Sequence, residues 1–432
     1  MTFLVLILVI FVLVFAGMHV AFAIGIASLG YILFDQVFQG GRTPLVMFAQ
    51  QMFDGVNSFS VLAIPLFLFA GLLMSASGIT ERLITFASAL VGHLRGGLAQ
   101  VGVLSNLMLA GMSGSAIADA AATSTVLVPQ MKRKGYPAGF SAAVMASASM
   151  IGPIIPPSIA FILLGAIMNI SVGRLFIAGV IPGLMMFVAL FLVTWFIARK
   201  RGFPVEPRAP RAMLWRATWQ ALLPLAAPLI VVRSMVIGIA TPTEAAAILV
   251  AYMAFLGLVV FRTLTLLSIL RAAAQAAALT GAIMLVVMVA KMFGYLAAQQ
   301  GFGIMLAGLL GHLHDYSWAL IIGINVMLLL LGTFVDMLPV MLILAPIIFP
   351  VLMELGMEPV HIGVMMVINL TLGLLTPPVG LVLVVVSAAS GVEVLRIFRE
   401  LLPFFLALLS VLMLVAFVPA ISLWLPNLVF DR

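Results

Sequence analysis

Long apolar runs joined by short polar loops fill almost the whole chain. Crossing the hydrocarbon core of a bilayer takes about 20 apolar residues in an α-helix, so these runs predict roughly a dozen crossings. Hydrophobic residues make up 65% of the 432 residues and charged residues only 8%, whereas soluble domains hold about 25% charged residues. A soluble fold could not hide so much apolar surface, so the sequence predicts an all-α polytopic membrane protein. The runs lie approximately over 3–34, 61–77, 83–112, 115–131, 138–170, 175–198, 213–240, 243–261, 265–290, 303–313, 317–335, 337–353, 360–390 and 401–427.

Several classes of enzyme lack their defining residues in this sequence. The chain has no cysteine, which excludes a thiolate nucleophile, a cysteine zinc site, an iron–sulfur cluster and a disulfide framework. HExxH, GxSxG and the Walker loop GxxxxGK[ST] are absent as well. We therefore expect neither an enzyme nor a bound cofactor. The first residues, MTFLVLILVIFVLVF, have no basic start and no small-residue cleavage site, so we expect a retained helix and not a removed signal peptide.

The charge of the chain fixes an expected orientation. The net charge is +7, but the basic residues sit in short loops, as the positive-inside rule predicts, so no nucleic-acid partner is expected. The densest basic stretch, over 199–216, also holds three prolines. We interpret it as a cytoplasmic loop that divides the chain into two halves. Its basic residues are Arg199, Lys200, Arg201, Arg208, Arg211 and Arg216.

The first half carries an ordered series of helix-breaking residues. The segment GMSGSAIADA contains Asp119, and Pro129 follows ten residues later. A polar turn with Pro137 comes next, and the pair Pro156 and Pro157 lies within IGPIIPPS. Pro removes a backbone donor and clashes with the preceding turn, so this series predicts a helical hairpin followed by a broken helix.

The second half repeats that series in the same order. The segment LGTFVDMLP contains Asp336, and Pro346 follows ten residues later. A polar turn with Pro359 comes next, and the pair Pro377 and Pro378 lies within LLTPPVG. Five features with nearly equal spacing predict an internal structural repeat.

Charge predicts that the two repeats point in opposite directions. The turn after the first hairpin is Lys132, Arg133 and Lys134, whereas the matching second turn carries Glu354 and Glu358 and no Lys or Arg over 354–359. The first turn therefore suits the cytoplasm and the second the opposite side. An inverted repeat with two re-entrant hairpins and two broken helices is typical of secondary transporters, whose sites lie near the bilayer midplane.

The hairpin tips and broken helices offer groups that bind ions. A helix end exposes carbonyls, and a helix start exposes N–H groups that favour an anion. Carbonyls together with Ser or Thr hydroxyls suit a hard cation such as sodium, so we expect a sodium site between each tip and its broken helix. The candidate binding residues are Ser113, Gly114, Ser115, Asp119, Gly152, Pro153, Pro156, Pro157, Gly332, Thr333, Asp336, Gly373, Thr376, Pro377 and Pro378. The sodium candidates among them are Ser113, Ser115, Gly152, Gly332, Thr333 and Thr376.

Structural interpretations of the same residues remain open. Gly, Pro and Ser also permit close packing of ordinary transmembrane helices. Asp119 and Asp336 could shape a cation site or relay a proton, or they could cap the helix that follows each tip. Lys291 could attract an anion or extend toward the membrane interface. Glu244, after Thr241 and Pro242, predicts an N-terminal helix cap.

These motifs resemble the large membrane subunit of tripartite ATP-independent periplasmic (TRAP) transporters. The likeness covers GMSGSAIADAAATSTVLVPQMKRKGYP, IGPIIPPS, TPTEAAA, LLLLGTFVDMLPVMLILAPIIFPV and LLTPPVG, and extends over essentially the whole chain. The resemblance implies an elevator mechanism and coupling to sodium. It also implies two separate partners, a small four-helix membrane subunit and a periplasmic binding protein that delivers an organic acid such as a dicarboxylate or a sialic acid.

The resulting prediction is sodium-coupled uptake of a carboxylate across the bacterial inner membrane, with both termini periplasmic. A stand-alone carboxylate transporter of related architecture is the alternative. An intramembrane enzyme lacks a visible nucleophile, and a structural scaffold would not explain the repeated helix breaks. We expect scaffold helices over 1–91 and 217–302, transport repeats over 92–198 and 303–400, the cytoplasmic loop over 199–216 and a C-terminal helix over 401–432.

Overall fold

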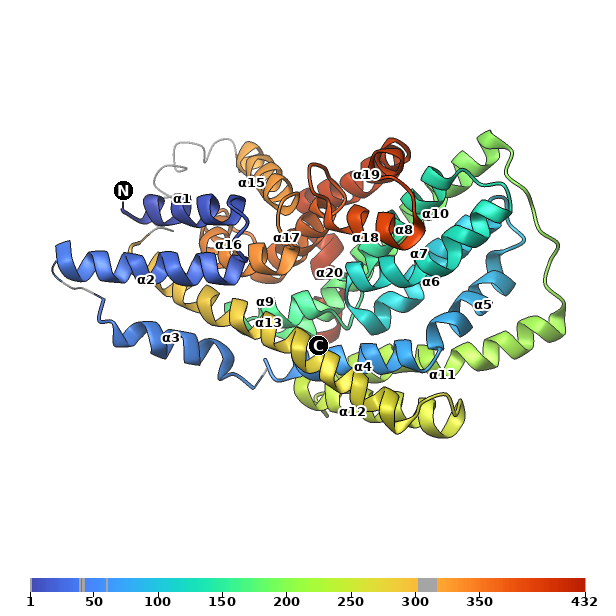
Figure 1. Cartoon of the computed structure of the whole chain (residues 1–432), viewed down its shortest axis with the longest axis horizontal. Coiled ribbons are helices and arrows are strands. Elements are labelled where there is room, and N and C mark those ends of the chain that lie inside the picture. Colours follow the sequence, from blue (N-terminus) through green and yellow to red (C-terminus); the bar gives the residue numbers. More distant parts are fainter. Residues whose placement is uncertain (1, 39, 41–42, 60, 302–316, 432) are drawn as a thin grey trace.

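The computed structural model describes residues 2–38, 40, 43–59, 61–301 and 317–431, and these residues form helices without any strand (Figure 1). The predicted apolar run over 303–313 lies outside the described residues. The helices are α1 (Thr2–Phe15), α2 (Val20–Phe38), α3 (Val46–Val56), α4 (Ala63–Ala76), α5 (Ile79–Val91), α6 (Gly97–Ser113), α7 (Ala116–Arg133), α8 (Ala138–Ala148), η1 (Ser149–Ile151), α9 (Ile159–Met168), α10 (Val172–Arg201), α11 (Arg211–Val236), α12 (Pro242–Phe255), η2 (Leu256–Val260), α13 (Leu266–Gln299), α15 (Ser317–Gly332), α16 (Met337–Glu354), α17 (Pro359–Gly373), α18 (Leu381–Ser390), α19 (Val394–Phe417) and α20 (Ala420–Phe430).

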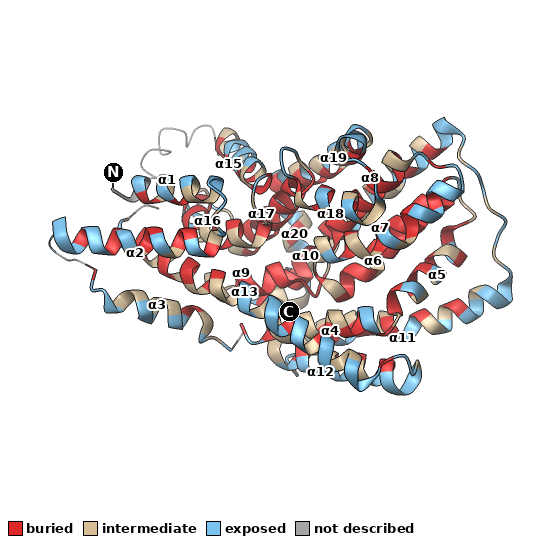
Figure 2. Cartoon of the chain, viewed as in Figure 1, coloured by how far each residue is buried: buried red, intermediate tan, exposed pale blue. Residues whose placement is uncertain are grey.

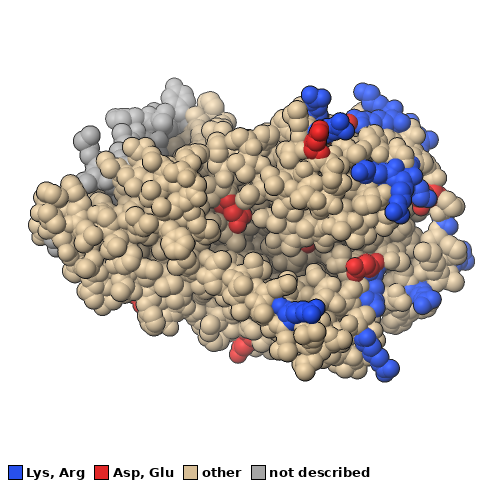
Figure 3. Space-filling model, in the orientation of Figure 1, with Lys and Arg blue, Asp and Glu red and all other residues tan. Residues whose placement is uncertain are grey.

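The lengths of these helices identify a multi-pass membrane protein. Among the described residues, seven helices are long and apolar enough to cross a bilayer. The bent pair α4 and α5, whose axes differ by 67°, would add one more span. The dozen crossings predicted from length stay a prediction, because the described chain also holds eight apolar helices of 10–17 residues, which could cross a bilayer only in combination. Lys and Arg gather at one end of the face seen in Figure 3, and most of the rest of that face carries no charge.

Helix boundaries differ from the predicted runs at several places: α3 lies in no predicted run, and three other differences change the predicted layout. The run over 83–112 is divided, because α5 ends at Val91 and Gly96 has a left-handed φ of +71° before α6. The single C-terminal helix predicted over 401–432 is two helices, α19 and α20, since Pro419 between them cannot continue a helix. The basic loop is shorter than 199–216, because α10 continues to Arg201 and α11 begins at Arg211.

Both predicted helix breaks are confirmed. After α8 and the short η1, the backbone leaves the helix until Ser158 caps α9. The second break separates α17, which ends at Gly373, from α18, which begins at Leu381. The bonds Pro156–Pro157 and Pro377–Pro378 within the breaks are both cis.

Burial separates an inner group of helices from an outer one (Figure 2). The inner helices α8 and α17 are buried along nearly their whole length. The outer helix α11 is buried over only 22% of its apolar window, and it exposes Trp215, Trp219 and Leu229. In a membrane protein such apolar outer surface faces lipid or a partner subunit, and the inner group is the part that encloses the hairpin tips.

Candidate functional site

The first hairpin turns at a glycine and is capped by a serine. α6 ends at Ser113, and Gly114 adopts a left-handed φ of +59°. The Ser115 Oγ then accepts a hydrogen bond from the Ala118 N–H at 3.4 Å, and the Ser113 Oγ accepts one from the Ser115 N–H at 3.3 Å. Ser115 is therefore the N-cap of α7, and it leaves the first N–H groups of α7 available.

The first tip packs directly on the first broken helix. A Cβ atom added to Gly114 would lie 2.7 Å from the Pro157 carbonyl oxygen, and one added to Gly152 would lie 2.7 Å from Asp119 Oδ2. Contacts this short leave no room for any side chain. The tip and the break, predicted to meet from their chemistry, are in backbone contact.

Asp119 is buried beside this contact without a partner for one oxygen. Its residue surface is 2% exposed, and within the described chain its Oδ2 accepts no hydrogen bond. A Cβ at Gly152 would also lie 3.1 Å from the Ser149 carbonyl oxygen, which accepts a hydrogen bond from the Gly152 N–H at 3.0 Å and keeps a second lone pair. An unpaired buried carboxylate is costly, and a cation bound between these oxygens would remove that cost.

The second tip also packs on its broken helix. A Cβ added to Gly373 would lie 2.7 Å from the Cα of Gly332. The Thr333 carbonyl accepts a hydrogen bond from the Gly380 N–H at 3.2 Å. The Thr376 Oγ1 donates to the Gly373 carbonyl at 2.7 Å. Oxygens of the sodium candidates are thus gathered where α15 ends and α17 breaks.

Asp336 plays a different role from Asp119. Its Oδ1 accepts a hydrogen bond from the Met337 N–H at 2.8 Å, at the start of α16. The capping interpretation is therefore confirmed for Asp336. It does not hold for Asp119, because the cap of α7 is Ser115.

One cavity of about 60 Å³ lies between the two tips. Its lining comes from 114–117 at the start of α7, Ile159 at the start of α9, 336–338 at the start of α16, and Leu374. A buried water needs about 10–15 Å³ measured in this way, so the cavity has room for a few water-sized groups. Residues from three helix starts thus line one small space, and each helix start carries the positive end of its dipole.

The structure distributes the predicted site residues around this cavity. Gly114, Ser115 and Asp336 line it directly. Asp119 and Gly152 belong to the contact between tip and break described above, and the remaining candidates lie on the same two tips and breaks. Pro377 and Pro378 are exposed and do not line the cavity.

The sequence analysis missed six lining residues: Ala116, Ile117, Met337 and Leu338, which adjoin predicted ones, and Ile159 and Leu374, which lie on the broken helices. Ser158 supplied a signal for Ile159. Its Oγ accepts from the Phe161 N–H at 3.2 Å, and a Ser after two prolines is a typical start of a helix. No comparable signal marked Leu374.

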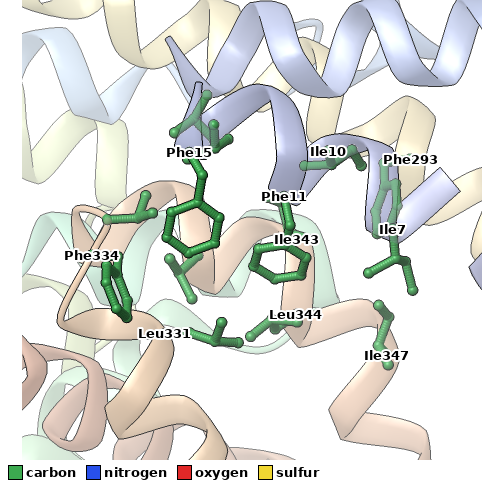
Figure 4. A pocket seen from close by; sticks show the side chains of 14 residues that line it. Ile7, Ile10, Phe11, Phe15, Phe293, Leu331, Phe334, Ile343, Leu344 and Ile347 are labelled. Atoms are coloured by element: carbon green, nitrogen blue, oxygen red, sulfur yellow. The ribbon is translucent and has the colours of Figure 1, made fainter. Parts of the chain in front are cut away.

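A second cavity, between α1 and the second tip, is entirely apolar (Figure 4). Phe15 of α1 lies edge-on to Phe334 of the tip, with ring centroids 5.2 Å apart. Ile343 and Leu344 of α16 close the other side. Because no polar side chain lines it, this cavity cannot solvate an ion. The side chains around it form an apolar contact between α1 and the tip.

The predicted cap at Glu244 is confirmed, and one further hydrogen bond joins two helices. Thr241 and Glu244 form a capping box at the start of α12, with Pro242 as its first residue. The Asn369 Nδ2 donates to the Asn325 Oδ1 at 2.8 Å, which joins α17 to α15. This interhelical bond lies one turn before the second break and holds it against the hairpin.

Comparison with known proteins identifies the family. The sequence profile of the tripartite ATP-independent periplasmic transporter, DctM component, matches residues 7–421. The sialic acid TRAP transporter large permease protein SiaM of Vibrio cholerae is 38% identical over 416 residues, which cover 96% of each chain. The C4-dicarboxylate TRAP transporter large permease protein DctM of Pseudomonas aeruginosa is 38% identical over 379 residues, 88% of this chain and 89% of that one.

A solved structure supports the fold alone. The YdaH transporter of Alcanivorax borkumensis superposes with a TM-score of 0.57 at 17% sequence identity, over 88% of this chain and 90% of that chain. Its relation to this chain is therefore architectural. The family match and the two close relatives are stronger, since they extend over nearly all of the sequence and name transporter permeases and not enzymes. The chain therefore belongs to the TRAP transporter family as its DctM, or large permease, component.

Proposed function

We propose that the protein carries an organic acid anion into the cell, coupled to sodium, through the cavity between its two hairpin tips. The observation that carries this proposal is that both tips and three helix starts face one small space. The named substrates of the two relatives, a sialic acid and a C4-dicarboxylate, are both carboxylates. A carboxylate is the class of ligand that helix starts favour.

The cavity suits an anion without using a basic side chain. No Lys or Arg is among its lining residues in the described chain. The attraction would come from main-chain N–H groups at the starts of α7, α9 and α16, and from the dipoles of these helices. Such groups fix the direction of a bound carboxylate because the N–H bonds point along the helix axes.

Sodium would make anion binding possible by offsetting two carboxylates. Asp336 lines the cavity and Asp119 is buried behind the first tip, so both would repel an incoming anion in this low-dielectric region. A sodium ion between Asp119, the Ser149 carbonyl and Ser115 would offset the first charge. A second ion among the oxygens of Gly332, Thr333 and Thr376 would offset the charge of Asp336, so anion and cation bind together.

The wider mechanism follows from the repeat. We propose that the two hairpin units lie inverted across the inner membrane, with both chain termini periplasmic. They would move as an elevator against the outer helices. A small four-helix membrane subunit would hold the outer helices, and a periplasmic binding protein would deliver the anion. The apolar contact between α1 and the second tip supports sliding, since no polar bond there must be broken.

Uptake into proteoliposomes tests the proposal. The chain is reconstituted with its small membrane subunit and binding protein, and radiolabelled sialic acid and succinate are offered with an inward sodium gradient or with potassium instead. Ser115→Leu should abolish sodium-dependent uptake, because the bulky side chain fills the cavity. Thr125→Leu is the matched control, since Thr125 lies exposed on α7 away from the tip. Uptake by Ser115→Leu with unchanged sodium dependence would refute the assignment.

A stand-alone transporter is the second candidate function. An uptake assay without the binding protein distinguishes it from the three-part system. Leaving out the binding protein should stop uptake if the protein works as a three-part system. Unchanged uptake without it would favour the stand-alone alternative, and the ion and substrate sites would keep their assignment in that case.

A further inference from the structure

A groove between α10 and α19 has the features of a lipid site. Its volume is about 860 Å³. Leu192, Val193, Phe196 and Ile197 of α10 form the apolar part, and Pro403 forms the opposite wall on α19. Lys200 and Arg201 close one end of the groove. An apolar channel that ends in positive charge matches a molecule with a hydrocarbon chain and an anionic head.

The length of the groove matches one leaflet of the bilayer. Eight residues separate Leu192 from Lys200, which is about 12 Å along a helix. The hydrocarbon half-thickness of a bilayer is about 15 Å. Trp195 also lines the groove, and Trp is enriched at the level of the lipid headgroups. Lys200 therefore lies at the depth of a lipid phosphate when the groove holds the acyl chain.

The charges at the end of the groove are not all neutralised. Arg201 is held by Glu400 through two hydrogen bonds, Nη1 to Oε1 at 3.0 Å and Nη2 to Oε2 at 2.7 Å. Within the described chain, neither Lys200 nor Arg199 forms an ion pair. Arg199 instead lies over the Trp195 ring, 5.4 Å from its centroid. Lys200 therefore keeps an unpaired charge in the lining of the groove, and Arg199 adds a second charge beside it, on the ring of Trp195.

We propose that this groove binds an anionic phospholipid, with an acyl chain along α10 and the phosphate at Lys200 and Arg199. A zwitterionic lipid would fill the apolar part equally but would not use the charge. Basic residues beside a membrane surface each contribute about 1 kcal/mol to binding anionic lipid. The proposal does not depend on the transported substrate or on the coupling ion.

Lipid titration of the delipidated protein in detergent tests this site, with native mass spectrometry and thermal unfolding as readouts. Phosphatidylglycerol should bind and raise Tm, whereas phosphatidylcholine and inorganic phosphate should have much smaller effects. The double variant Arg199→Gln, Lys200→Gln should weaken phosphatidylglycerol binding about thirtyfold, because it removes two basic residues. The matched control is Lys132→Gln, Arg133→Gln, which removes two exposed charges outside the groove and should bind like the wild type.

Three results would overturn the proposal. Equal stabilisation by phosphatidylcholine would show that any lipid fills the groove. Equal loss in the two double variants would show that only the total charge matters. Stabilisation by inorganic phosphate alone would show that the acyl chain contributes nothing. A Phe196→Ala variant measures the contribution of the acyl chain apart from that of the charges. It should weaken binding of phosphatidylglycerol while Arg199 and Lys200 remain.

Discussion

At the scale of single residues, two aspartates in matching positions of the repeat have different surroundings. The Asp336 carboxylate caps α16 by accepting from the Met337 N–H. Asp119 lies in the first turn of α7, but the N-cap of that helix is Ser115. The Asp119 Oδ2 is buried and accepts no hydrogen bond in the described chain. The helix start of α16 satisfies part of the Asp336 carboxylate, whereas the Oδ2 of Asp119 is left for a cation to bind.

Substituting each aspartate by asparagine separates these roles. Asn caps helices about as well as Asp, so Asp336→Asn should keep its stability to within about 1 kcal/mol. It should also keep part of the increase in Tm that sodium chloride gives over potassium chloride. Asp119→Asn removes the charge that a sodium ion would offset and should lose that sodium-specific increase at the first site. Thermal unfolding in the two salts measures both effects, and an unchanged increase in Asp119→Asn would exclude Asp119 as a sodium ligand.

Two left-handed glycines provide a second test at this scale. Gly114 at the first tip and Gly135 in the turn after α7 have φ of +59° and +84°. An Ala at either position costs about 1–2 kcal/mol in backbone strain. Only at Gly114 would the added Cβ also meet the Pro157 carbonyl, whereas nothing lies within 4 Å of a Cβ at Gly135. Gly114→Ala should therefore abolish uptake, and Gly135→Ala should only lower Tm. Equal uptake by both variants would mean that the tip contact is not needed.

At the scale of helices, α1 and the second hairpin tip make a contact that an elevator motion must break. The Phe15 and Phe334 rings are 5.2 Å apart, and both side chains are partly exposed. Since the chain has no native cysteine, a Phe15→Cys, Phe334→Cys pair can be cross-linked selectively with mercuric ion. The cross-link should abolish uptake, and excess thiol should restore it.

A pair within one helix is the matched control for this experiment. Phe187 and Phe191 on α10 have ring centroids 5.6 Å apart and cannot move relative to each other. Cross-linking Phe187→Cys, Phe191→Cys should leave uptake unchanged. Full uptake by the cross-linked Phe15–Phe334 pair would mean that the second tip does not move against α1.

Features of single helices could be predicted from the sequence because their causes are local. The cap at Ser115, the capping box at Thr241 and the breaks at Pro156 and Pro377 each depend on residues within a few positions. The division of 401–432 at Pro419 had the same kind of local signal, and it was missed because the apolar run around it is continuous.

Contacts between distant segments could not be predicted from the sequence in the same way. The cavity joins Gly114 to Asp336, and nothing in the local sequence says that these two tips meet. The different partners of Asp119 and Asp336 depend on which neighbouring backbone reaches each carboxylate. The pattern indicated two sites of the same kind, whereas in the structure Asp336 caps a helix and Asp119 does not.

At the scale of the whole molecule, a buried inner group of helices carries the tips and an apolar outer group surrounds it (Figure 2). Membership of the TRAP family follows from the match over residues 7–421. The inverted arrangement that we propose for the two hairpin units would explain why their starts meet at mid-depth, since units that enter from opposite sides approach each other tip to tip. The proposed coupling of sodium to anion uptake depends on this arrangement.

Labelling of single cysteines from one side of the membrane tests the inverted arrangement directly. Lys132→Cys and Glu354→Cys are placed separately in the cysteine-free chain and exposed to a membrane-impermeant maleimide on intact spheroplasts. The account predicts that Glu354→Cys reacts at once and that Lys132→Cys reacts only after the membrane is permeabilised. Reaction of both residues from the same side would contradict it.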